Sequence, residues 1–398
     1  MSQTQSNAYI IEIQDRAAGI ITRDERGFRF FSSERLFDSL EGRQFRSARE
    51  AERAARAVFS ERSGRGARNS FPTDPIERTR VMITRRHILA TTLLLATALA
   101  APAHAEDKPA EIRIGTQKGG FFPAVRQRQT LENAFKPLGI EVKWIDFQFG
   151  PPLLEAINVG SVDFGYVGDS PPIFAQAGGA KIRYVAAVKS EGNTQAIIVP
   201  KDSAIKTLAD LKGKRVAFGK GSSAHNLLVA ALEKADLSWS DITPAPLAPA
   251  DATAAFIKGS VDAWSIWDPY LALAELKEKA RVIAFDKDVH KPNAFYIANT
   301  DFVDKYPSLV AKLNTTFASE GVWANEHHED VAKAQADATG VDIEAVRRFV
   351  GRSNFRVVPL DAEIIASQQA VADRFAKLGL IPKPVNVSGI VWKWNPGS

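Results

Sequence analysis

The sequence predicts an α/β fold made of two lobes with a cleft between them. From residue 111 onward, short runs rich in β-branched and aromatic residues alternate with helix-like segments, which is the pattern of parallel βαβ units. The composition is that of an ordinary globular protein, with 45% hydrophobic and 24% charged residues. Because ligands of such folds bind beyond the carboxyl ends of strands and between domains, we expect a binding site in the cleft.

The strands and helices are predicted in order along the chain. Residues 111–115 (EIRIG) alternate apolar and polar side chains, as a half-buried strand does. The predicted strands are 111–115, 141–147, 164–167, 184–188, 196–200, 215–218 and 261–265, and the predicted helices are 126–138, 152–159 and 171–177. The chain from 306 to 378 is expected to be mostly helical, with breaks near Gly340 and Pro359.

Residues 82–105 have the layout of a secretory signal. Met82 is followed by the basic pair Arg85 and Arg86, an apolar run over 88–101 and a small-x-small sequence that ends at Ala105. The apolar run is shorter than the roughly 20 residues that span a bilayer. The paired arginines also resemble a twin-arginine export signal. We therefore predict that the protein is exported.

Residues 1–81 differ in composition from the rest of the chain, because they contain 15 Arg and no Lys. They include short β-prone runs over 8–31 and a basic amphipathic helix pattern over 46–60. A secretory signal belongs at an N-terminus, so we interpret residues 1–81 as an extension and Met82 as the true initiator. The alternative is a small fused module whose role the sequence does not reveal.

The charge of the main part argues against nucleic acid as a partner. The whole chain has a formal net charge of +5, but residues 106–398 carry 34 basic and 34 acidic side chains. A phosphate-binding surface needs an excess of basic residues, which this part lacks. The chain also has no cysteine, so disulfides and thiolate chemistry are excluded.

Three turns of small polar residues open predicted helices. They are Gly168-Asp169-Ser170 before two prolines, Gly221-Ser222-Ser223 with His225 and Asn226 just after, and Phe149-Gly150 before two prolines. A helix start offers unpaired N–H groups and a partial positive charge, which suit an anion. Each turn alone is explained as an ordinary helix cap, whereas three in one exported α/β chain favour an anion site.

Other candidate ligand residues follow strands. Gln117 and Gly119 lie after the first strand, where Gln117 would donate its amide to an anion or close the turn. Trp264 and Trp267 flank a later strand, and each is either an apolar wall for a carbon chain or part of the core. Asp268 precedes Pro269 and is first of all a candidate helix cap.

These motifs resemble the aliphatic-sulfonate-binding proteins of ABC importers, within the nitrate/sulfonate/taurine-binding group. The matching strings are RIGTQKGG (113–120), GPPLLEAINVGSVDFGYVGDSPPIFAQAGGA (150–180), KTLADLKGKRVAFGKGSSAHNLLVAAL (206–232) and PADATAAFIKGSVDAWSIWDPY (249–270). The resemblance extends from about residue 111 to about residue 395 and is most specific over 150–270. Residues 1–81 lie outside it.

The resemblance implies a type II periplasmic-binding-protein fold with a two-stranded hinge. Lobe one would comprise 106–199 and 299–398, and lobe two 200–298, with crossings near Val199-Pro200 and 295–299. The family's ligand elements map onto Gln117, the 168–170 turn, the helix start at 221–226 and the 264–269 stretch. The protein would be a periplasmic monomer that delivers an alkyl sulfonate to an ABC permease, with no cofactor.

A sulfonate is a permanent anion without a proton, so neutral donors suffice to hold it. We expect Ser222, Ser223 and nearby N–H groups to bind the head group, joined by Ser170 and Gln117 from the other lobe. Taurine, nitrate, sulfate esters or a heterocycle remain alternative ligands, and a sensory receptor is an alternative role. An enzyme is not expected, because no G-x-S-x-G motif is present and the residues 327–329 lack the spacing of a zinc site.

Overall fold

The structure is a computed structural model that describes residues 8–13, 16–24, 27–32, 35–40, 43–65 and 108–396. The chain divides into two compact units, residues 1–101 and 102–398. The expected secretory signal over 82–105 lies outside the described residues. Among the residues described, no helix is both long and apolar enough to cross a membrane.

The first unit is an antiparallel sheet with one long helix. Its elements are β1 (Ala8–Ile13), β2 (Arg16–Asp24), β3 (Gly27–Ser32), η1 (Arg35–Leu40), β4 (Gln44–Phe45) and α1 (Ala48–Arg65), with the strands in the order β1-β2-β3-β4. Phe30, Phe37, Ala51 and Ala55 are buried in a core within this unit. The β-prone runs and the amphipathic helix expected here are confirmed, whereas the assignment of Met82 as initiator stays a prediction.

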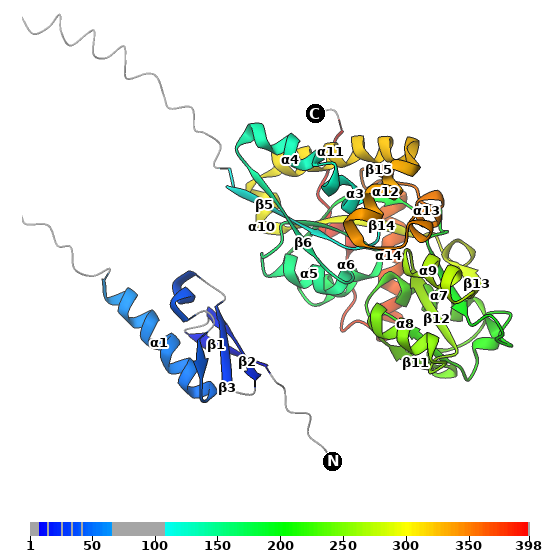
Figure 1. Cartoon of the computed structure of the whole chain (residues 1–398), viewed down its shortest axis with the longest axis horizontal. Helices are drawn as coiled ribbons and strands as arrows, with labels where there is room; N and C mark the ends of the chain where they lie inside the picture. The colour runs from blue at the N-terminus through cyan, green and yellow to red at the C-terminus, as the bar shows by residue number, and fades with distance from the viewer. Residues whose placement is uncertain are drawn as a thin grey trace, which may run out of the picture. The chain divides into compact units, whose positions relative to one another are not determined.

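The second unit is built of two α/β lobes, seen in Figure 1. Lobe one has a six-stranded sheet in the order β15-β8-β14-β7-β5-β6. Its elements before the first crossing are β5 (Glu111–Thr116), α3 (Phe122–Gln127), α4 (Thr130–Phe135), η2 (Lys136–Leu138), β6 (Glu141–Asp146), α5 (Gly150–Asn158), β7 (Phe164–Gly168), α6 (Ser170–Ala177) and β8 (Ile182–Lys189). After the return they are β14 (Asn293–Asn299), α10 (Thr300–Lys305), α11 (Pro307–Glu326), α12 (His328–Thr339), α13 (Ile343–Gly351), β15 (Val357–Val358), α14 (Ala362–Lys377) and η6 (Val387–Ile390).

Lobe two has a five-stranded sheet in the order β11-β10-β12-β9-β13. Its elements are β9 (Gln195–Val199), η3 (Ala209–Leu211), β10 (Arg215–Phe218), α7 (Ser223–Lys234), η4 (Trp239–Asp241), β11 (Thr243–Pro246), α8 (Pro249–Ile257), β12 (Ala263–Trp267), α9 (Tyr270–Lys277), β13 (Arg281–Phe285) and η5 (Asp286–Asp288). The predicted α/β alternation and the division into two lobes are therefore confirmed.

Strand direction and the crossing points differ from expectation. The βαβ units are parallel, but β14 runs antiparallel to β7 and β8, and β9 runs antiparallel to β12 and β13. Because β9 pairs in lobe two and β14 in lobe one, the chain crosses at 190–194 and at 289–292. The boundaries expected at 199/200 and 298/299 are thus wrong by about one strand. An apolar run signals a buried strand but not the sheet that the strand joins.

Each sheet is buried on both faces, which fits its apolar strands. Along β14, Phe295 and Ile297 pack into one core cluster while Tyr296 and Ala298 pack into another. Along β9, alternate residues divide in the same way between two clusters of lobe two. The carboxyl ends of the parallel strands are therefore held firmly at the cleft.

The helix predicted over 126–138 is broken into α3 and α4. Gln129, which lies between them, has a φ of 55°, and this left-handed conformation ends one helix before the next begins. The helical character of 306–378 and the break at Gly340, which has a φ of 65°, are confirmed.

Gly321 in α11 provides a test of how tightly lobe one is packed. A Cβ at this position would lie 2.2 Å from the carbonyl oxygen of Phe355. We expect Gly321→Ala to lower the free energy of unfolding by about 1–3 kcal/mol through overpacking, although alanine is favoured in helices. Gly351→Ala, at the end of α13 with no atom within 4 Å, should be neutral or stabilising. Urea denaturation measures the free energy of unfolding of both variants. Equal changes in the two variants would contradict the close packing described at Gly321.

Candidate functional site

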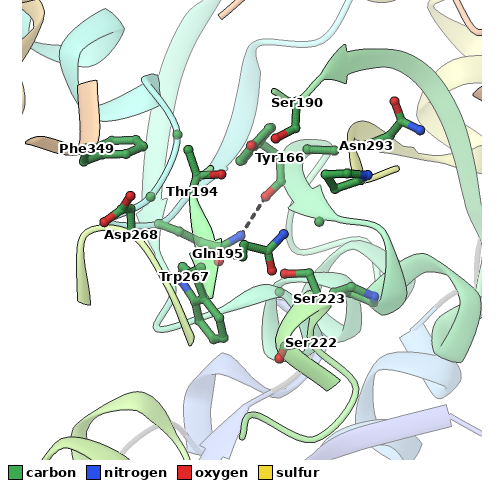
Figure 2. A pocket seen from close by; sticks show the side chains of 18 residues that line it. Tyr166, Ser190, Thr194, Gln195, Ser222, Ser223, Trp267, Asp268, Asn293 and Phe349 are labelled. Carbon is green, nitrogen blue, oxygen red and sulfur yellow. Dashed lines mark hydrogen bonds between the residues drawn. The ribbon is translucent and has the colours of Figure 1, made fainter. Parts of the chain in front are cut away.

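A cavity lies between the two lobes, at the ends of strands and the starts of helices. Eighteen residues line it, and Figure 2 shows their side chains. Lobe one contributes Gln117, Gly119, Gly120, Gly150, Tyr166, Gly168, Pro171 and Phe349; the crossings and β14 contribute Ser190, Thr194, Pro292, Asn293 and Ala294; lobe two contributes Gln195, Ser222, Ser223, Trp267 and Asp268. The expected location in the cleft is therefore confirmed as the position of a cavity.

The start of α7 presents hydrogen-bond donors to this cavity. Ser222 precedes the helix in an extended conformation, and its hydroxyl donates to the carbonyl oxygen of Gly219 at 2.6 Å. Ser223 is the first helical residue, and its hydroxyl makes no hydrogen bond within the described part of the chain. The first N–H groups of a helix have no partner within that helix. Ser223 is thus the side chain best placed to donate to a ligand.

The other two predicted donor turns offer fewer hydrogen-bond donors to the cavity. α5 and α6 each carry two prolines directly after their first residue, and proline has no N–H group. The helix starts of lobe one therefore have fewer donors than α7. Their contribution to the cavity is the backbone of Gly150 and Gly168 and the ring of Pro171.

Glycines let the two lobes touch at the cavity. A Cβ on Gly168 would lie 2.7 Å from Cβ and 2.8 Å from Oγ of Ser223, which belongs to the other lobe. A Cβ on Gly119 would lie 3.0 Å from the carbonyl oxygen of Asp268. Glycine is needed at Gly168 in particular, because any side chain there would push the lobes apart. The structure is thus a closed form.

Asp268 is the one charged residue among the eighteen that line the cavity, and it is already paired. Its carboxylate is 2% exposed and binds the Arg352 guanidinium at 2.7 and 3.0 Å. It also accepts the N–H of Ala272 at 3.0 Å, in keeping with the expected role at a helix start. Burial raises the pKa of Asp268 to about 7, although Arg352 lowers it. The same Arg352 binds Glu275 at 2.8 Å, so this cluster links α13 of lobe one to lobe two.

Asp169, Ser170 and Asn226, predicted to contact ligand, do not line the cavity. The Ser170 hydroxyl donates to Asp169 at 2.8 Å, and the Asn226 amide donates to the other oxygen of Asp169 at 2.7 Å. Arg374 donates to the Asn226 oxygen at 2.9 Å. These side chains are bound to one another across the lobes, so they support closure instead of offering donors to an anion.

Gly221, His225 and Trp264 are also placed outside the lining. Gly221 has a φ of 73° in the turn before α7 and donates its N–H to His225. The His225 ring stacks on Phe218 and Phe174, and burial lowers its pKa to about 4. Trp264 is 2% exposed and packs near Phe256, so it is a core residue.

Several lining residues were not predicted from the sequence, and one of them is Gln195. It is 8% exposed, its amide donates to Asp286 at 3.3 Å, and its oxygen Oε1 is buried without a partner. The Gln117 amide donates to the carbonyl oxygen of Tyr166 at 2.7 Å, which closes the turn after β5. Phe349 and Tyr166 form the aromatic end of the cavity, and the sequence patterns placed them only in a helical stretch and in a strand.

The described residues form no candidate metal site. No group of three or more His, Asp or Glu side chains there is arranged to hold a metal ion. What the arrangement offers is a cavity with neutral donors at one end and aromatic rings at the other.

Comparison with known proteins places the chain among sulfonate-binding proteins. A family model described as NMT1/THI5 like matches residues 135–329. The structure of the alkanesulfonate-binding protein SsuA from Xanthomonas axonopodis pv. citri, bound to MOPS, is 40% identical, with 72% of this chain and 99% of that chain covered and a TM-score of 0.68. The periplasmic aliphatic sulphonate binding protein SsuA from Escherichia coli is 38% identical, with 73% and 94% covered and a TM-score of 0.66. An Escherichia coli (strain K12) relative, provisionally named an aliphatic sulfonates-binding protein, is 39% identical over 73% of this chain and 91% of its own.

Relatives with other ligands or activities are more distant. A taurine-binding periplasmic protein of Escherichia coli (strain K12) is 29% identical over 45% of this chain. The nitrate-binding protein NrtA from Synechocystis PCC 6803 and the desulfurization enzyme DSZB share the fold at 14% and 17% identity. The close relatives are thus binding proteins.

The buried Asp286 predicts a pH-dependent stability. Burial raises the pKa of Asp286 to about 7, so the folded protein holds a proton there that the unfolded chain releases at a lower pH. The stability contributed by this group therefore falls as the pH rises towards 7. We expect Asp286→Asn to gain stability relative to the native chain between pH 5 and pH 8, by about 1–3 kcal/mol. Urea denaturation at pH 5 and pH 8 measures the free energy of unfolding of the native chain and the variant, with the exposed Asp337→Asn as control. If the difference between Asp286→Asn and the native chain were the same at both pH values, the prediction would be wrong.

Proposed function

We propose that this chain, which belongs to the family of aliphatic sulfonate-binding proteins, is the periplasmic receptor of an ABC importer and binds an aliphatic sulfonate in the cavity between its lobes. The observation that carries the proposal is the closed cavity at the start of α7, where neutral donors are available and the one lining carboxylate is paired with Arg352. The protein would bind its ligand without transforming it.

The chemistry of the cavity supports a permanently charged anion. A sulfonate presents three acceptor oxygens and no proton, so it needs donors only. The Ser223 hydroxyl and the first N–H groups of α7 supply donors, and the partial positive charge of the helix start favours a negative head group. Phosphate, which carries a proton near neutral pH, would also call for an acceptor carboxylate, and the lining carboxylate Asp268 is occupied by Arg352 and Ala272.

Closure is the second part of the proposed mechanism. A ligand shifts an equilibrium between open and closed forms only if it binds the closed form better. The cavity is lined from both lobes, so only the closed form supplies all of its contacts. The bonds from Asn226 to Asp169 and from Arg352 to Asp268 then add to the stability of that form. We infer that the importer's permease recognises this closed form.

A second candidate ligand is an aminosulfonate such as taurine. The observation that favours it is the oxygen of Gln195, which is buried in the cavity wall without a partner and would accept a hydrogen bond from an ammonium group. The carboxylates of Asp169 and Asp268 are both engaged with other side chains.

Isothermal titration of the whole chain with a panel of anions tests the ligand class. The panel comprises methanesulfonate, butanesulfonate, taurine, nitrate, sulfate and phosphate. The proposal predicts that alkanesulfonates bind most tightly. Tighter binding of taurine would favour the second candidate. Binding of phosphate or nitrate alone would contradict both.

Two adjacent serines provide a matched pair of variants for the head-group site. Ser223→Ala should weaken alkanesulfonate binding by about 1.5–3 kcal/mol, the typical value of a hydrogen bond to a charged group. Ser222→Ala should have a smaller effect, because the Ser222 hydroxyl already donates to Gly219. Titration calorimetry measures both affinities. An unchanged affinity for Ser223→Ala, or a larger loss for Ser222→Ala, would refute the assignment.

A further inference from the structure

The cavity continues beyond the head-group site into a second hollow on the side of α13. The two share six lining residues, among them Gly120, Tyr166, Thr194 and Phe349. In Figure 2, Ser222 and Ser223 lie at one end of the cavity and Phe349 at the other. A ligand that holds its head group at α7 would therefore direct the rest of its length towards this hollow.

Aromatic side chains form the apolar part of this hollow's surface, and Ser190 and Thr194 line it as well. Phe121, Phe349 and Phe355 line it together with Tyr166, and the Phe121 and Phe355 rings lie 5.2 Å apart. Two polar side chains at the far end are already bound. The Ser353 hydroxyl donates to the carbonyl oxygen of Phe349 at 2.8 Å. Likewise the Asn354 amide donates to Glu191 at 3.1 Å, and the Asn354 oxygen accepts the N–H of Arg356 at 2.9 Å.

The walls of the hollow are also fixed in place. Gly120 has a φ of 73°, and a Cβ there would lie 2.9 Å from the Tyr166 ring. Phe349 is 4% exposed, and Arg352, which directly follows α13, is bound to Asp268 and Glu275 of lobe two. In the closed form this pairing holds Phe349 over the cavity, so the length of the hollow cannot adjust freely to a longer ligand.

We propose that this hollow, lined by Gly120, Phe121, Tyr166, Phe349 and Phe355 and here called the tail chamber, receives the carbon tail of the ligand and that Phe349 sets the longest tail accepted. The proposal rests on the proposed function and narrows its substrates to sulfonates whose carbon tail is short enough to end against Phe349. Trp267, suggested by the sequence as the tail's wall, lines the cavity but not the tail chamber.

The test is a chain-length profile measured by titration calorimetry on the whole chain. Methane-, propane-, pentane- and octanesulfonate are titrated into the native protein and into Phe349→Leu, Phe349→Trp, Trp267→Phe and Phe285→Leu. The measured quantity is the ratio of each Kd to that of methanesulfonate. In the native protein, Kd should fall about fourfold for each methylene that enters the tail chamber, and then rise once the chamber is full.

The proposal predicts opposite shifts for the two Phe349 variants. The smaller Phe349→Leu moves the optimum to longer tails, and the larger Phe349→Trp moves it to shorter ones. Phe285→Leu, a half-buried phenylalanine of β13 that does not line the cavity, keeps the native profile. Both Phe349 variants must still bind methanesulfonate, which shows that they are folded.

Three outcomes would overturn the tail chamber, and only the third would also overturn the proposed function. An unchanged length optimum in both Phe349 variants, with methanesulfonate still bound, would overturn the tail chamber alone. A shift of the length optimum in Trp267→Phe, with no shift in the Phe349 variants, would place the tail at Trp267 and would also overturn the tail chamber. Absence of sulfonate binding by the native chain would overturn the proposed function and the tail chamber together.

Discussion

The close approach of β7 to the start of α7 is the contact on which the site depends. Gly168 of one lobe lies so near Ser223 of the other that a single added carbon would overlap it. This approach closes the cavity around the first turn of α7, where a helix leaves its N–H groups unpaired. It also allows Asn226 to bind Asp169 and Arg352 to bind Asp268. A more open arrangement would lose the cavity and these bonds at once.

The charges around the cavity explain how an anion can be held without a dedicated cation. Burying an unpaired charge is costly, so a buried anion must be met by donors or by an opposite charge. The Asp268 carboxylate is neutralised by Arg352, and burial raises the pKa of Asp286 to about 7, which reduces the negative charge behind Gln195. The neutral donors of α7 are then enough. Such a site favours an anion that never carries a proton, and its aromatic end favours one with an apolar tail.

The sequence predicted the parts that depend on local patterns. Short stretches of sequence were enough to predict the alternation of strands and helices and the donor-rich turn before α7. What could not be predicted depends on which segments meet in space. The apolar run at 195–199 does not reveal which sheet it joins, and Ser170 and Asn226 look like ligand donors until their partner Asp169 is known. Phe349 lies in a stretch predicted only to be helical, and its place in the cavity lining depends on tertiary contacts that the sequence does not reveal. Matching strings located the site region, whereas tertiary contacts decided which of its side chains remain available.

The most direct test of the central claim is a crystal structure of the protein with pentanesulfonate bound. The account predicts that the sulfonate oxygens lie within hydrogen-bond distance of the Ser223 hydroxyl and the first N–H groups of α7, with the carbon tail directed towards Phe349. A head group held elsewhere, or a ligand bound to one lobe of an open form, would contradict it.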